Sequence, residues 1–193
     1  MMTLLVTRVQ GAQWTPFWDA LAERSDAKVT DGVNNKGEPT RHIELSSGVS
    51  FDLERHGDQI TSFDGDHSGH GAVQCSWEIY VAVRVHMAAC SPGEDPQLEA
   101  DLDDALDRIN DFIAENSLVP IKRSQLADAI AQREQKAKLA LLGRPQEDQR
   151  KKCEADGLAA FIKAIKLTPR EKRKSSLDDL LSVKRPPVMN PCL

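Results

Sequence analysis

The sequence predicts an α+β protein in which an antiparallel sheet is packed by two helices and followed by a helical C-terminal arm. Two observations carry this prediction. Short segments that alternate apolar and polar residues, separated by glycine-containing turns, gather before residue 90, and apolar stripes at helical spacing dominate after residue 95. The expected order is β-α-β-β-β-β-α followed by further helices, so that strands and helices are segregated along the chain.

The first elements are a short strand and a helix. The apolar residues of 4–9 favour a strand, and Thr15-Pro16 offers an N-cap followed by proline at the first helical position, which predicts a helix over 16–25. The stretch 31–39 is rich in glycine, asparagine and proline, and we expect a loop there.

An antiparallel meander should follow this loop. The segments 42–45 and 49–53 flank a Ser-Ser-Gly turn, and a Gly-Asp turn precedes another short strand at 60–63. The strongest strand pattern covers 79–87, where five apolar residues alternate with other residues. Such alternation predicts a strand with one face on the core.

A long amphipathic helix is predicted over 96–116. Its apolar stripe is expected to pack on the sheet. Its opposite side carries a crowded set of carboxylates, which we call the acidic face: Asp101, Asp103, Asp104, Asp107 and Asp111.

The remaining sequence predicts three helices and a tail. Helices are expected over 124–142, over about 146–167 and from about 168 onward, and the proline-rich tail should fray from about residue 184. We therefore place an acidic α+β domain at 1–119 and a basic helical arm at 120–193, joined at Pro120.

Charge is divided between these two parts. Residues 1–119 contain 8 Lys and Arg against 21 Asp and Glu, a net charge of −13, whereas residues 120–193 contain 17 against 9, a net charge of +8. The total of −5 hides this asymmetry. A basic arm on an acidic body indicates either an acidic partner or neutralisation within or between chains.

The leading hypothesis is a non-enzymatic binding or regulatory protein. Its basic arm would contact an acidic partner, either a protein or a nucleic acid, because clustered cations neutralise phosphates without base specificity. The residues expected to do so, called here the arm cations, are Arg150, Lys151, Lys152, Lys163, Lys166, Arg170, Lys172, Arg173 and Lys174.

Three alternatives stay open at this point. The acidic face would block the basic site of a nucleic-acid-binding protein or enzyme, acting as an inhibitor. The arm and the body would pair between copies of the chain, giving a homo-oligomeric assembly. In the third alternative, an enzyme or metal site centres on Asp66, His67 and His70, but their spacing matches no zinc pattern, so we predict no catalytic residue, metal or cofactor.

The sequence also bears on location. The N-terminal residues lack a basic segment followed by an apolar one, and no apolar run approaches the ~18 residues that span a bilayer, so we expect a cytoplasmic protein without a membrane partner. The four cysteines form no Cys-x-x-Cys pair and are expected to be reduced thiols: Cys75, Cys90, Cys153 and Cys192.

Overall fold

The computed structural model describes residues 14–155 and 157–192. It confirms the α+β class, with a four-stranded sheet followed by helices. The chain divides into two compact units, residues 1–64 and residues 65–193. The boundary that we expected at residue 120 lies inside the second unit, between two helices of one bundle. The strand expected at 4–9 lies outside the described residues.

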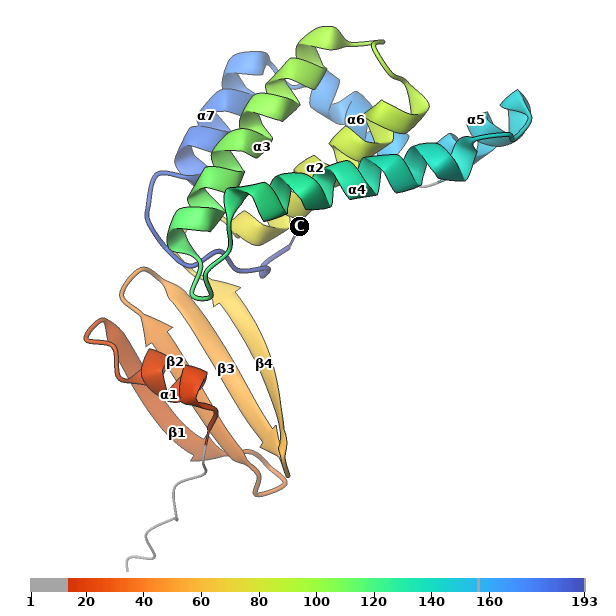
Figure 1. Ribbon diagram of the computed structural model, residues 1–193. Helices are drawn as coiled ribbons and strands as arrows, with labels where there is room; N and C mark the ends of the chain where they lie inside the picture. The colour runs from red at the N-terminus through yellow and green to blue at the C-terminus, as the bar shows by residue number, and fades with distance from the viewer. Residues whose placement is uncertain (1–13, 156, 193) are drawn as a thin grey trace, which may run out of the picture. The chain divides into compact units, whose positions relative to one another are not determined.

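The first unit is a sheet with a short helix on one face (Figure 1). Its elements are α1 (Pro16–Ala22), β1 (Ala27–Val33), β2 (Pro39–Leu45), β3 (Val49–His56) and β4 (Gln59–Asp66), the last two residues of β4 belonging to the second unit. The strands follow one another in the order β1-β2-β3-β4, a meander in which β2, β3 and β4 correspond to predicted strands. Gly48 at the β2–β3 turn has a φ of 85°, a left-handed conformation that glycine adopts without strain.

The core of this unit lies between the sheet and α1. Ile43 of β2 pairs with Val29 of β1 and with Phe51 of β3, and Ile43 is fully buried. The ring of Trp18 on α1 lies 5.6 Å from the ring of Phe51. The alternation in β2 and β3 therefore places one apolar face under the helix, as predicted.

β1 was not predicted as a strand. Asp31 and Gly32 suggest a loop, yet the backbone of β1 pairs with β2 from Ala27, opposite Leu45, to Val33, opposite Pro39. Pairing with a well-formed neighbour overrides weak local strand propensity.

The second unit is a helical bundle (Figure 1). Its helices are α2 (Val73–Cys90), α3 (Pro96–Asn116), α4 (Arg123–Leu141), α5 (Gln146–Ala155), α6 (Leu158–Leu167) and α7 (Arg170–Leu180). The predicted helices at 96–116 and 124–142 are confirmed. The single helix expected over 146–167 is two helices, because the backbone turns left-handed at Gly157, with a φ of 75°.

The predicted strand at 79–87 is wrong, because these residues lie within the helix α2. Val81, Val83 and Met87 are all fully buried, although they do not share one side of a helix. Neighbouring helices contact α2 on several sides, since its buried residues divide between two core clusters. A helix enclosed in this way is apolar around most of its circumference and loses the period of 3.6 residues that would identify it.

The apolar stripe of α3 packs on helices, which corrects its expected packing on the sheet. Leu106, Ile109 and Ile113 belong to one cluster with Trp77 of α2 and Leu177 of α7. Within this cluster the Trp77 Nε1–H donates a 2.8 Å hydrogen bond to Oδ1 of the buried Asn110. The unit is therefore built by helix-on-helix packing around α2 and α3.

The C-terminal tail is held in place rather than frayed from residue 184. Arg185 is buried with its side chain 0% exposed, and Val188 is also buried. The Asp66 amide donates to the Asn190 carbonyl at 2.7 Å, and the Gln74 amide donates to the Val188 carbonyl at 3.0 Å. The tail thus closes the start of α2.

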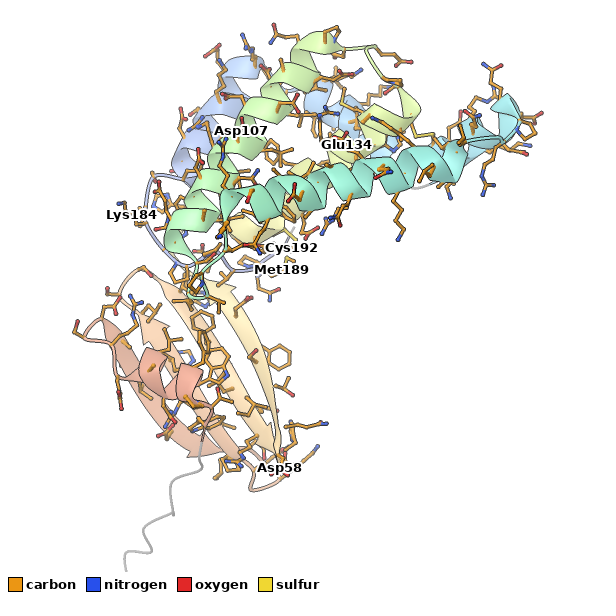
Figure 2. All side chains as sticks on the ribbon, viewed as in Figure 1. Asp58, Asp107, Glu134, Lys184, Met189 and Cys192 are labelled. Carbon is orange, nitrogen blue, oxygen red and sulfur yellow. A yellow bond between two sulfur atoms is a disulfide. The ribbon has the colours of Figure 1, made fainter. Side chains whose placement is uncertain are left out.

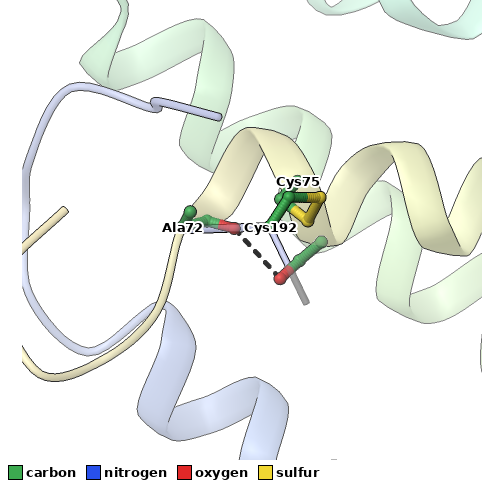
Figure 3. Close-up of a disulfide and its surroundings, with 4 residues drawn as sticks. Ala72, Cys75 and Cys192 are labelled. Atoms are coloured by element: carbon green, nitrogen blue, oxygen red, sulfur yellow. Dashed lines mark hydrogen bonds between the residues drawn. A yellow bond between two sulfur atoms is a disulfide. The ribbon is translucent and has the colours of Figure 1, made fainter. Parts of the chain in front are cut away.

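Two disulfides correct the expectation of reduced thiols. Cys75 of α2 bonds to Cys192 in the tail (Figure 3), with Cα atoms 5.3 Å apart, and Cys90 bonds to Cys153 of α5, with Cα atoms 5.8 Å apart. Both separations are ordinary for a disulfide. The error has a clear source: each bond joins cysteines that are more than 60 residues apart in the chain, so the spacing of the cysteines carries no sign of their pairing.

Candidate functional site

The acidic face of α3 contacts arginines of the same unit. Asp101 accepts hydrogen bonds from Arg170 and Arg173 of α7, each with an N–O distance of 2.8 Å. The Asp101 side chain is only 12% exposed. The strongest negative element of the sequence and one of its strongest positive elements are therefore joined inside one chain.

This contact perturbs the titration of Asp101. The hydrogen bond from Arg170, together with that from Arg173, outweighs partial burial and holds the pKa of Asp101 below its ordinary value. The same carboxylate raises the pKa of Arg170. Both groups are therefore charged at neutral pH.

Arginines also engage most of the remaining acidic face. Arg84 of α2 binds Asp103 at 2.6 Å. Arg123 at the start of α4 binds Asp107, labelled in Figure 2, at 2.9 Å and Asp111 at 2.8 Å. Asp104 is the one acidic-face residue for which the described part of the chain provides no ion pair. Little free negative charge is left for a basic partner.

The arm cations divide into paired and unpaired groups. Besides Arg170 and Arg173, Lys166 lies 3.5 Å from Asp95, while Arg150 and Lys151 pair with glutamates one turn away on α5. The other four are exposed and have no ion pair within 14–155 and 157–192: Lys152, Lys163, Lys172 and Lys174. We call these four the free lysines.

Two of the three candidate metal residues contact other side chains. Oδ2 of Asp66 accepts a 2.6 Å hydrogen bond from Arg185, and the His70 Nδ1 lies 3.0 Å from Oδ1 of Asp179 on α7. Among the described residues, no cluster of three or more His, Cys, Asp and Glu side chains is arranged to hold a metal ion. Asp66 therefore serves as a structural anchor for the tail.

Burial and hydrogen bonding oppose each other at Asp66. Burial would raise the pKa of Asp66, but hydrogen bonds from Arg185 and Ser68 to its carboxylate outweigh this effect and hold the pKa below its ordinary value. The side chains of Asp66 and Arg185 are both 0% exposed. Arg185 also donates to the carbonyls of Gly71 and Leu180, so the buried charge is well satisfied.

A pocket of about 390 Å³ opens among α2, α3, α6 and α7. Its walls are mainly apolar, and its charged residues come from α3 and α7, including Asp101, Arg170 and Arg173. The site could not be predicted from the sequence, because its α2 wall, with Tyr80 and Val83, has the pattern of a strand. The sequence indication of this site is Phe161, an aromatic residue in a short amphipathic segment. In the structure Phe161 lies on α6, is exposed and lines the pocket.

Burial raises the pKa of Tyr80, which lines this pocket, and Arg173 and Arg108 partly counter the shift. The Tyr80 hydroxyl is therefore protonated at neutral pH and available as a donor. No hydrogen bond to this hydroxyl comes from any residue that the structure describes.

Comparisons with known proteins give no relative. No family model, curated protein or solved structure matches the chain. Within the described residues, no helix has both the length and the apolar character required to cross a bilayer.

Proposed function

We propose that the protein is a non-enzymatic binding protein whose basic C-terminal helices contact the phosphates of a nucleic acid. The observation that carries the proposal is the set of free lysines, which remain after the chain has paired its other arm cations internally. All four are exposed and lie on α5, α6 and α7.

The chemistry of these side chains favours backbone contact over base recognition. A lysine ammonium acts as a compact point charge on phosphate, whereas bases are bound by stacking on aromatic rings. Only one aromatic residue, Phe161, occurs in the sequence after residue 112. The expected binding is therefore weak in sequence preference and strong in salt dependence.

The test is fluorescence anisotropy with a labelled 20-base-pair duplex, as DNA and as RNA of the same sequence. If all four free lysines neutralise phosphates, the logarithm of affinity should fall with the logarithm of salt with a slope of about −3 to −4, a loss of about 100-fold between 50 and 200 mM. Binding that is absent with both duplexes, or that does not respond to salt, would contradict the proposal.

A matched pair of variants separates these lysines from general charge. Reversing Lys152, Lys163 and Lys172 together (K152E/K163E/K172E) should abolish binding. The control, K28E/K36E/K136E, changes net charge equally at exposed lysines outside α5–α7 and should retain most of the affinity. Equal losses in the two variants would show that the arm has no special role.

The alternatives draw less support from the structure. An inhibitor acting through the acidic face would have to displace arginines such as Arg84 and Arg123 from it. In an assembly through arm and body, Asp101 of one copy would have to contact α7 of another copy. A single chain already makes this contact internally. As to location, the two disulfides favour an oxidising compartment, so the cytoplasmic prediction has no support from the cysteines.

A further inference from the structure

We propose that the pocket among α2, α3, α6 and α7 binds a small molecule with an apolar body and one anionic head group, such as a medium-chain carboxylate. This site shares Lys174 with the nucleic-acid contact proposed above, but neither proposal depends on the other. The inference rests on the size of the pocket, its walls and the charges at its mouth.

The pocket has the size and walls of a small-molecule site. Its volume of about 390 Å³ falls in the range of ~300–1,000 Å³ that such sites occupy. Apolar side chains of four helices form its walls: Ile79, Val83, Leu98, Leu102, Ala105, Phe161, Ile165 and Leu177. Phe161 is 42% exposed, and an apolar ligand would cover part of its ring.

The mouth of the pocket favours an anion over a cation. Three cationic side chains, Arg170, Arg173 and Lys174, line it against the two carboxylates Asp101 and Asp104. Asp101 is occupied by the two arginines, whereas neither Lys174 nor Asp104 has an ion pair within the described chain, so three cationic and two anionic side chains leave a net charge of +1. Tyr80 also lines the pocket.

Isothermal titration of the intact, disulfide-bonded protein with sodium decanoate tests the proposal, with decan-1-ol as the uncharged probe. We expect saturable binding of one decanoate per chain, at least fivefold tighter than binding of decan-1-ol. Absence of saturable decanoate binding would overturn the proposal. Equal affinity for the two probes would overturn the anionic head group as the basis of selection.

Two pairs of variants locate the binding. Ser176 is exposed and lines the pocket, whereas its neighbour Ser175 is exposed and does not. Ser176→Trp should block the mouth and weaken decanoate binding at least tenfold, and Ser175→Trp should leave it within twofold. An unchanged affinity in the Ser176→Trp protein, with its far-UV circular dichroism intact, would place the ligand elsewhere.

The second pair tests the head group. Lys174→Gln should weaken decanoate about fivefold and leave decan-1-ol unchanged, whereas Lys172→Gln, on the same helix but outside the pocket, should change neither. Equal effects of the two glutamine variants on decanoate would refute a local contact with Lys174. The nucleic-acid test reverses Lys152, Lys163 and Lys172 and leaves Lys174 in place, so the two proposals fail independently.

Discussion

Replacing Arg185 by methionine removes the guanidinium that ties the C-terminal tail to the rest of its unit. In the native protein its Nε donates to Asp66 at 2.6 Å, and its other nitrogens donate to the carbonyls of Gly71 at 2.6 Å, Leu180 at 3.0 Å and Val183 at 2.8 Å. The substitution leaves the carboxylate of Asp66 buried without its counter-charge. Removing one partner of a buried ion pair costs about 3–5 kcal/mol, and we expect a loss of that size in the free energy of unfolding.

The methionine side chain keeps much of the volume, so the loss reports electrostatics and hydrogen bonding more than a cavity. Urea denaturation followed by circular dichroism at 222 nm measures this loss in the free energy of unfolding. The signal reports the unit formed by residues 65–193, because most helices belong to that unit. Lys184→Met, at the exposed neighbouring position, is the matched control and should stay within about 0.5 kcal/mol of the wild-type protein.

A double variant completes the test. Asp66→Leu combined with Arg185→Met removes both charges, and its cost should be smaller than the sum of the two single costs, since no buried charge is left alone. The reasoning is refuted if Arg185→Met costs less than about 1 kcal/mol, or if the two single costs simply add.

Three further predictions concern the same unit. Because the pKa of Asp66 is lowered in the folded state, its ionised form adds stability above about pH 4, and this stability is lost as the pH falls through the lowered value. The difference in stability between wild type and Asp66→Asn, measured from urea midpoints, should therefore be smaller at pH 2 than at pH 7. Asn110→Ala leaves the buried Trp77 Nε1–H without its acceptor and should cost about 1–3 kcal/mol in the same denaturation assay, whereas a change under 0.5 kcal/mol would contradict this. Mass spectrometry after iodoacetamide treatment should show no modified cysteine before reduction and four after it, and Cys192→Ser should lower stability by about 2–4 kcal/mol, because its disulfide links positions 117 residues apart.

The helices that face solvent on one side could be predicted from the sequence, and the helix enclosed by others could not. α3 has an apolar stripe and an acidic face, and its residues 96–116 match the prediction at both ends. α2 is surrounded by other helices, so its apolar residues do not recur with the helical period of 3.6 residues. Its β-branched residues favoured a strand instead. A stretch of 18 residues without a turn signal was the clue to a helix, since strands are usually shorter.

Charge pairing could be predicted as a possibility but not in its detail. The sequence shows an acidic helix and a basic arm, and Asp101 contacts Arg170 and Arg173 within the chain. It does not show that Arg84 and Arg123, which lie outside the arm cations, would bind the rest of the acidic face. Such contacts depend on the packing angles between helices, which composition does not specify.

The residues that complete the second unit are made well after the residues that they join. Arg185, Val188 and Cys192 join the tail to Asp66, Gln74 and Cys75, which precede them by more than 100 residues. During synthesis the helices of this unit must therefore wait, with part of their apolar surface uncovered, until the tail leaves the ribosome. The β2–β3 hairpin closes over a few residues and is under no such delay. Chaperone binding to nascent chains should accordingly concentrate on the helical unit.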